Sequence, residues 1–253
     1  MPDPTGRFSN RVEHYIKYRP GYPEALVEIL KAECSLSADS IVADIGSGTG
    51  ILSEMFLKNG NLVYGVEPNL EMREAGENLL RNYPRFRSVA ARAEETSLPA
   101  ASVDFITAGQ SFHWFDRELV KVEFARLLKA SGWVVLVWNE RLTTTTPFLI
   151  AYEELLKTYS TDYAQVDHRR MDDAVMRDFF GPDAFSRRQL KNEQVFDYEG
   201  IRGRLESSSY APEPGHPNYL PMLEELQRIF EAHQQDGQVV CEYLTQIYYG
   251  HLN

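Results

Sequence analysis

The residues best suited to bind a ligand are one acid and three glycines near residue 50. The segment DIGSGTG, residues 44–50, begins within an apolar run, residues 41–45, and leads into a helical pattern. Its glycines, Gly46, Gly48 and Gly50, allow a sharp turn and let a ligand approach the backbone where a Cβ atom would otherwise stand. Free amide groups at the start of the following helix can donate hydrogen bonds to that ligand. This segment therefore predicts a cradle for a small molecule.

Two carboxylates indicate which ligand fits this cradle. Asp44 lies at the mouth of the turn, where its charge repels a pyrophosphate and attracts an ammonium group. Glu67 follows the next apolar run, about twenty residues past the glycines, and an acid there can accept both hydroxyls of a ribose. A dinucleotide fingerprint also needs a glycine where this chain has Ile51. These residues favour a ligand with a ribose and an ammonium group but no phosphate.

The elements that must position these residues alternate between strands and helices. Apolar runs predict the strands, and helical spacing of apolar residues predicts the helices between them. The strands are expected at residues 41–45, 62–66, 86–90, 103–108 and 132–138, and the helices at 51–58, 70–81 and 117–129. Strands that alternate with helices of this length form a parallel sheet covered on both faces. We therefore expect a doubly wound α/β fold.

A single domain is expected over residues 1–253, with residues 1–35 as an N-terminal helical segment and residues 41–138 as the ligand-binding core. Residues 140–191 are polar and interrupt the strand rhythm, so they predict an inserted cap or lid. Residues 192–253 are expected to supply closing strands and a helix. These later elements are expected as strands at 194–198 and 239–249 and helices at 148–157 and 219–233.

Three segments of the core, in this order, resemble a known family. They are VADIGSGTG (42–50), VYGVEPN (63–69) and ARAEETSLPAASVDFITAGQSFHWFD (91–116), and they are similar to the class I S-adenosylmethionine-dependent methyltransferases. The resemblance is strongest to the small-molecule branch, which includes ubiquinone and menaquinone C-methyltransferases and trans-aconitate methyltransferases. It covers about residues 8–138 and includes the leading FSNRVEHYIKYRPGYP. It implies a Rossmann-like, mostly parallel, seven-stranded sheet whose last strand is antiparallel, with S-adenosyl-L-methionine as the cofactor.

The resemblance also implies a cofactor site with a part for each portion of the cofactor. The residues it assigns to the methionine and ribose portions are Tyr15, Arg19, Asp44, Gly46, Ser47, Gly48, Gly50 and Glu67. Those it assigns to the adenine are Pro68, Asn69, Met72, Ala93 and Glu94. Many relatives have Asp where this chain has Arg92, so recognition of the adenine amino group passes either to Glu94 or to backbone.

On the acceptor side, the resemblance places four residues beside the sulfonium, at the floor of the substrate pocket. They are Gln110, Ser111, His113 and Trp114, of which Gln110 and Ser111 also border the cofactor. Methyl transfer from a sulfonium is an in-line displacement, so the protein mainly aligns the reactants and excludes water. If the acceptor must lose a proton, His113 is the candidate general base, since histidine side chains ordinarily have a pKa near neutrality. A carboxylate acceptor needs no base, and a structural histidine then explains the residue equally well.

Most of these assignments have a structural alternative. The glycines can serve only a tight turn, Met72 can be ordinary core packing, and Tyr15 and Arg19 can pin the N-terminal helix to the domain. Basic residues of the cap are interleaved with acids, which is typical of a solvated face, although an anion-binding lid for a polycarboxylate is the alternative. These cap residues are Arg169, Arg170, Arg177, Arg187, Arg188 and Lys191.

Composition limits the partners and the compartment. A formal net charge of -11 disfavours nucleic acid and anionic lipid surfaces, and no apolar stretch is long enough to span a membrane. Cys34 and Cys241 are far apart and in no metal-binding spacing, so we expect reduced thiols and no metal site. We expect a cytoplasmic monomer or homodimer.

The sequence therefore predicts a methyltransferase that acts on a small-molecule acceptor, through a carboxylate or a hydroxyl. Two other classes remain as alternatives. A nicotinamide-dependent oxidoreductase would use the same fold, but Ile51 and Asp44 argue against it. A non-catalytic nucleoside-binding regulator would keep the cofactor site and lack turnover.

Overall fold

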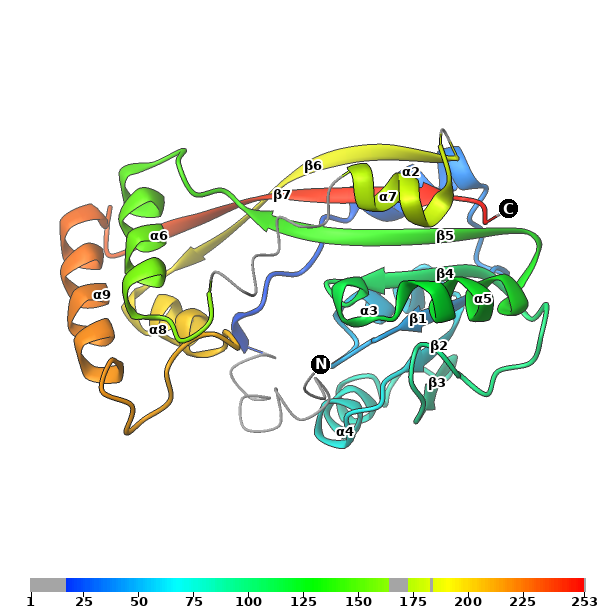
Figure 1. The fold of residues 1–253 in the computed structure, drawn as a ribbon, viewed down its shortest axis with the longest axis horizontal. Coiled ribbons are helices and arrows are strands. Elements are labelled where there is room, and N and C mark those ends of the chain that lie inside the picture. Colours follow the sequence, from blue (N-terminus) through cyan, green and yellow to red (C-terminus); the bar gives the residue numbers. More distant parts are fainter. Residues whose placement is uncertain (1–16, 164–172, 183, 253) are drawn as a thin grey trace.

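The computed structural model describes residues 17–163, 173–182 and 184–252. These residues form one seven-stranded sheet in the order β3-β2-β1-β4-β5-β7-β6 (Figure 1). The strands are β1 (Ile41–Ile45), β2 (Leu62–Val66), β3 (Phe86–Val89), β4 (Val103–Gly109), β5 (Leu128–Arg141), β6 (Phe185–Phe196) and β7 (Val239–Gly250). All pairs among the first five strands are parallel, and β7 runs antiparallel to both β5 and β6. The expected doubly wound α/β sheet with an antiparallel last strand is confirmed.

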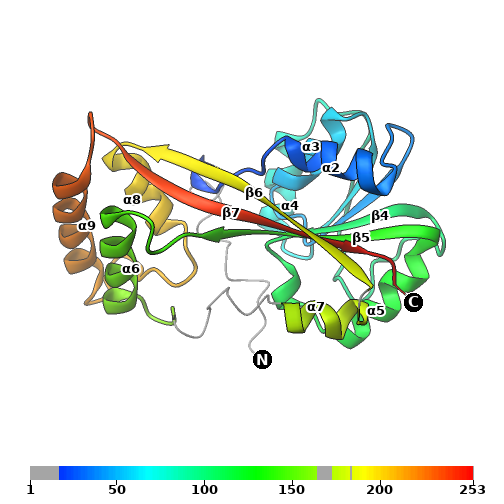
Figure 2. The same cartoon turned by 90° about the horizontal axis from the view of Figure 1, so that it is seen from above.

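Helices cover both faces of the sheet, and Figure 2 shows α2 (Ala25–Cys34) and α3 (Ile51–Lys58) on one face and α5 (Arg117–Leu127) and α7 (Asp173–Phe180) on the other. The alternation of side chains along a strand explains this layering. In β5, Val135 and Val137 pack into the core on the α2 side, whereas Val134 and Leu136 pack into the core on the α5 side. A strand buried on both faces reads as a continuous apolar run, which is why β5 was predictable.

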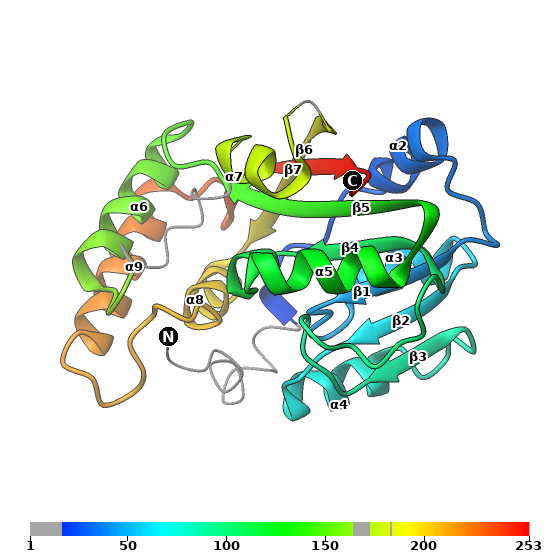
Figure 3. The ribbon, with the colours of Figure 1, turned by 45° about the vertical axis from the view of Figure 1, so that its right-hand side comes forward.

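The long strands β5, β7 and β6 continue past the other four and carry a helical cap (Figures 1 and 3). The cap helices are α6 (Pro147–Tyr159), α8 (Tyr198–Glu206) and α9 (Tyr219–His233), and α6 and α9 lie side by side. The cap has its own apolar core, which includes Tyr152, Ile201, Leu226, Cys241 and Tyr243. It therefore stands as a second packed layer beside the ligand-binding core.

The elements after β4 differ most from the sequence-based expectation, and β5 extends beyond both ends of the strand predicted at 132–138. β6 begins at Phe185, inside the range predicted as a cap, and the predicted strand at 194–198 gives way to α8 from Tyr198. β6 pairs only with β7 and is exposed on most positions, so it has no apolar run to reveal it. α7 also packs on the sheet through Phe179 and Phe180 instead of extending the cap.

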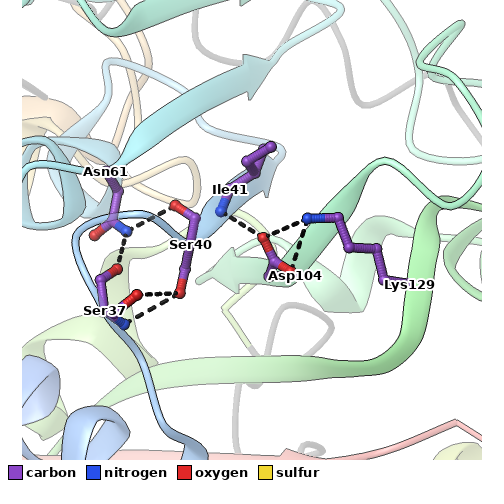
Figure 4. Close-up of polar contacts among 6 residues, drawn as sticks. All are labelled: Ser37, Ser40, Ile41, Asn61, Asp104 and Lys129. Carbon is purple, nitrogen blue, oxygen red and sulfur yellow. Dashed lines mark hydrogen bonds and ion pairs between the residues drawn. The ribbon is translucent and has the colours of Figure 1, made fainter.

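The edge of the sheet opposite the strands' carboxyl ends is fixed by a polar network (Figure 4). Asp104 of β4 accepts a hydrogen bond from the Ile41 amide at 2.8 Å and pairs with Lys129 of β5 at 2.9 Å. Asn61 donates to the backbone carbonyls of Ser37 and Ser40 at 2.7 and 2.8 Å. These contacts hold the starts of β1, β2, β4 and β5 in register, which in turn aligns their carboxyl ends.

Candidate functional site

Two adjoining hollows lie at the carboxyl ends of β1, β2 and β4, where ligands bind in open α/β sheets. The larger is a cavity of about 120 Å³, lined by Gly46, Gly48, Glu67, Pro68, Asn69, Met72, Arg92, Ala93, Glu94, Gly109, Gln110, Ser111, Trp114 and Phe115. The smaller, of about 40 Å³, shares some of these residues and adds Arg19, Pro20, Tyr22, Asp44, Ser47, Thr49, Ile51 and Leu52. Most of the residues proposed from the sequence therefore lie in one continuous region.

The glycine turn between β1 and α3 adopts left-handed backbone at all three glycines. Their φ angles are 67° at Gly46, 55° at Gly48 and 87° at Gly50. A Cβ atom on Gly46 would stand 2.7 Å from that of Ser111, and one on Gly50 would stand 2.5 Å from Leu80. Gly46 and Gly48 line the cavity, whereas Gly50 caps α3 and allows that helix to pack against Leu80. Packing therefore excludes a side chain at Gly46 and Gly50, while Gly46 and Gly48 also form part of the cavity wall.

Glu67 joins the glycine turn to the helix after β2. Its Oε2 accepts a hydrogen bond from the Gly48 amide and its Oε1 accepts one from the Asn69 amide, both at 2.9 Å. Burial raises the pKa of this carboxyl against the lowering effect of the two amides. Asn69 itself caps α4 (Leu70–Leu79) by accepting from the Met72 amide at 2.8 Å. Each carboxylate oxygen has a second acceptor position, so Glu67 can still accept two hydroxyl groups from a ligand in the cavity.

Asp44 lies deeper and lines the smaller hollow. Only 1% of its surface is exposed, and it accepts hydrogen bonds from Ser53 at 2.6 Å and Thr107 at 3.0 Å. Burial raises the pKa of Asp44 to about 6, although both hydroxyls act to lower it. In the same hollow, Thr49 Oγ1 is buried and has no hydrogen-bond partner among the residues that the structure describes. A carboxylate and an orphaned hydroxyl at one place fit the ammonium and carboxylate ends of an amino acid.

Arg19 approaches this hollow from the N-terminal segment. Its Nη2 donates to the backbone carbonyl of Ser207, at the end of α8, at 3.0 Å. The same side chain therefore contacts the cap and lines the hollow that holds Asp44. Tyr15, which the resemblance paired with Arg19, lies outside the described residues.

Gln110 and Ser111 line the cavity, but their side chains already hold strands together. The side-chain amide of Gln110 accepts a hydrogen bond from the Asn139 backbone N–H at 3.1 Å and donates one to the Asn139 backbone carbonyl at 3.3 Å. Ser111 Oγ donates to the Ile45 carbonyl at 2.9 Å. Gln110 also has a φ of 56°, a costly conformation for a residue with a side chain. Both residues thus shape the cavity chiefly through their backbone and carbon atoms.

His113 and Trp114 occupy a short 3-10 helix, Phe112–Trp114. Trp114 lines the larger cavity, whereas His113 lines neither hollow. The His113 ring packs against Trp114 at 4.3 Å and against Trp138 at 5.0 Å between centroids. This position favours a packing role for His113.

At the end of the cavity that the resemblance assigns to the adenine, this chain has Arg92 where many relatives have Asp. Arg92 lines the cavity, and its Nε lies 3.6 Å from Oε2 of Glu94, while Oε1 of Glu94 accepts from the Asp116 amide. Phe115 and Gly109 also line the cavity and were not proposed. Gly109 ends β4, one residue past the end of the strand predicted at 103–108, and a glycine at a strand's carboxyl end was the signal that could have identified it.

No group of three or more His, Cys, Asp and Glu side chains within the described ranges is arranged to hold a metal ion. None of the helices in those ranges is long and apolar enough to cross a bilayer.

Comparison with known proteins places this geometry in context. A family model described as a methyltransferase domain matches residues 43–136. An uncharacterized methyltransferase of Schizosaccharomyces pombe is 29% identical over 151 residues, which cover 59% of each chain. One of Mycobacterium tuberculosis is 36% identical over 135 residues, which cover 53% of this chain and 52% of that protein. The chain thus spans about half to three fifths of the length of these curated relatives.

Solved structures share the fold across nearly the whole chain. A protein of Anaeromyxobacter dehalogenans assigned to the type II methyltransferases has a TM-score of 0.67 and 23% identity, and covers 92% of this chain and 97% of its own. The YcgJ protein of Bacillus subtilis has a TM-score of 0.56 and 21% identity, with coverages of 90% and 97%. Similarity at these identities shows that the fold is shared with these structures.

Proposed function

We propose that this chain, which matches a methyltransferase domain family model over residues 43–136, transfers a methyl group from S-adenosyl-L-methionine to a small-molecule acceptor. The observation that carries the proposal is the placement of Glu67. Its two oxygens are fixed by the Gly48 and Asn69 amides, and the side chain lines the cavity that the glycine turn opens. A buried carboxylate with free acceptor positions beside such a turn suits a ribose diol.

The residues around Glu67 would hold the rest of the cofactor. Asp44, Arg19 and the orphaned hydroxyl of Thr49 share one hollow, and they would bind the ammonium and carboxylate groups of the methionine portion. Met72 is 5% exposed and lines the larger cavity, where it would offer a polarisable surface to the adenine. The bound cofactor would supply a methyl group already activated by its sulfonium charge.

What the protein must add is alignment and the exclusion of water. Gln110 and Ser111 fix the floor of the cavity by tying β4 to Asn139 and Ile45, so the acceptor side has a rigid wall. We propose that the acceptor presents a carboxylate or a hydroxyl beside Trp114. His113 would act as a base only for a hydroxyl acceptor, and its packing between two tryptophans supports the carboxylate.

We further propose a cytoplasmic enzyme whose partners are small molecules and which acts as a monomer or homodimer. The net charge of -11 supports this choice, since it opposes binding to nucleic acid. Cys34 and Cys241 are both buried and unpaired with each other, as expected in a reducing compartment.

Calorimetry of the purified protein with S-adenosylhomocysteine and with NAD tests the proposal. We expect micromolar-range binding of S-adenosylhomocysteine and negligible binding of NAD. If NAD binds as tightly, the oxidoreductase alternative replaces the proposal. Tight binding of S-adenosylhomocysteine without methylation of any compound in a broad acceptor screen would favour a nucleoside-binding regulator.

A further inference from the structure

A second group of charged residues lies inside the cap and has no part in the cofactor site. It consists of Arg141 at the end of β5, Arg204 on α8 and Glu153 on α6, surrounded by tyrosines from four segments. We refer to these three residues as the cap arginine cluster. Charged groups are rarely buried unless they are paired, so the partners of each residue determine whether its charge is balanced.

Arg141 is paired on one side only. Its Nη2 lies 2.6 Å from Oε2 of Glu153 and donates to the Tyr163 hydroxyl at 3.1 Å. Its side chain is 10% exposed, yet Nη1 is buried and has no hydrogen-bond partner among the described residues. The guanidinium also lies 5.1 Å from the ring of Tyr152. The Nη1 group of Arg141 therefore remains without an acceptor among the described residues.

Arg204 lacks a carboxylate partner altogether within the described ranges. It is 7% exposed, and its hydrogen bonds go to the hydroxyls of Tyr243 at 3.3 Å and Ser208 at 3.0 Å. Neutral hydroxyls satisfy donors but do not balance the charge of a guanidinium. The neighbouring Glu153 is already shared between Arg141 and Lys157, which lies 4.0 Å away.

Tyr243 contacts Arg204 and is paired in strand register with Arg141. Arg141 and Tyr243 stand directly opposite each other on β5 and β7, so their side chains leave the same face of the sheet. Tyr243 accepts the hydrogen bond from Arg204. Burial raises the pKa of Tyr243 and of Tyr163, so these phenols stay neutral. Among the described residues of the cap core, two buried guanidinium groups and one buried carboxylate leave an excess of one positive charge.

This cluster lies next to the cofactor site. Asn139, whose backbone holds Gln110 at the cavity, precedes Arg141 by two residues, or about 7 Å along a strand. On the other side, Ser208 follows Ser207, whose carbonyl accepts the hydrogen bond from Arg19. The cap arginine cluster is therefore joined to the cofactor site along β5 and at the end of α8.

We propose that the cap arginine cluster binds a carboxylate group of the acceptor, with Arg141 and Arg204 as the anchoring residues. The proposal rests on the methyltransferase function and specifies its substrate class as an organic acid. A single carboxylate balances the excess charge, whereas a phosphate dianion would reverse it. The planar guanidinium also offers two parallel donors that match the two oxygens of a carboxylate.

Ligand-observed NMR tests this with acetate and acetamide, which share a methyl group and differ in the carboxylate. Saturation transfer to each probe is titrated with the full-length protein saturated with S-adenosylhomocysteine. We expect acetate to bind at least about tenfold more tightly than acetamide. Arg204→Met should abolish this difference and, because no carboxylate of the described residues pairs with Arg204, should leave no opposite charge there unpaired. Arg202→Met is the matched control, since Arg202 lies on the same helix, is 37% exposed and pairs with Glu206.

The outcomes separate this inference from the proposed function. Equal affinities for acetate and acetamide in the wild-type protein overturn the inference, and this comparison needs no variant to fold. Acetate binding that survives Arg204→Met, or that is lost equally in Arg202→Met, overturns it as well. Failure of the wild-type protein to bind S-adenosylhomocysteine in a separate calorimetric titration overturns the methyltransferase proposal instead.

Discussion

Replacing Glu67 with glutamine changes one atom of the side chain and tests the ribose assignment directly. The carboxylate accepts from the Gly48 and Asn69 amides through different oxygens, both at 2.9 Å. In Glu67→Gln an NH₂ group takes the place of one oxygen, so one of these amides loses its acceptor. The same NH₂ group cannot accept a hydrogen bond from a ribose hydroxyl.

The size of both effects follows from burial, because Glu67 is only 9% exposed. A hydrogen bond to a charged acceptor contributes about 1.5 to 3 kcal/mol. Loss of one such bond to the cofactor corresponds to a roughly 10- to 150-fold weaker binding of S-adenosylhomocysteine. A buried amide left without an acceptor also costs about 1 to 3 kcal/mol of unfolding free energy.

Calorimetry with S-adenosylhomocysteine and urea unfolding together measure the two effects. Glu74→Gln is the control, since Glu74 lies on α4, close in sequence, and is exposed. We expect that control to match the wild-type protein in both measurements. Wild-type affinity and stability in Glu67→Gln would refute the reasoning and leave Glu67 as an ordinary acid at the end of a strand.

Three further changes test other parts of the site. Burial raises the pKa of Asp44 from 3.8 to about 6, so the folded state binds this proton more tightly than the unfolded chain does. The unfolding free energy should therefore fall by up to about 3 kcal/mol as the pH rises from about 4 to about 6. Asp44→Asn should flatten this part of the profile in urea titrations at each pH, and an unchanged profile would exclude the shift. Gly46→Ala should lower the melting temperature and the affinity for S-adenosylhomocysteine more than Gly215→Ala does. Both glycines have a positive φ, but only at Gly46 would the added Cβ lie 2.7 Å from Ser111, so equal effects would contradict the packing argument. His113→Ala should cost about 1 to 3 kcal/mol of unfolding free energy through its two lost ring contacts and leave the calorimetric affinity for S-adenosylhomocysteine unchanged, whereas weaker binding would place the ring at the cofactor.

The core of the fold was predictable because its strands are buried on both faces. Residues 41–45 and 62–66 are apolar runs in the sequence and strands with the same bounds in the structure. β6 was missed over residues 185–193 because an exposed edge strand carries alternating polar and charged residues and leaves no apolar run. Apolar runs in the sequence mark buried strands, and they are missing where a strand has one neighbouring strand and an exposed surface.

The sequence could also predict which residues gather at the cavity, but not what each side chain does there. Asp44 and Glu67 end neighbouring parallel strands, and the carboxyl ends of such strands meet at one edge of the sheet. The roles of Gln110 and Ser111 depend on Asn139 and Ile45, which are distant in sequence and become partners only through the packing of the sheet. Their types indicated polar contacts, and only the structure shows that those contacts are with backbone.

Which positively charged residues of the cap can bind an anion also depends on burial, which the sequence does not show. The sequence pointed to Arg187 and Arg188 as residues of a possible anion-binding lid, and both lie on exposed β6, where they pair with Asp173 and Glu33. An exposed arginine with an acidic partner gains little by binding another anion, since water and salt screen its charge. Arg204 is 7% exposed and pairs with no carboxylate among the described residues, so an anion bound there gains a strong partner. If the acceptor is an organic acid, the cap interior is therefore the place where the fold can distinguish it from a neutral compound of the same shape.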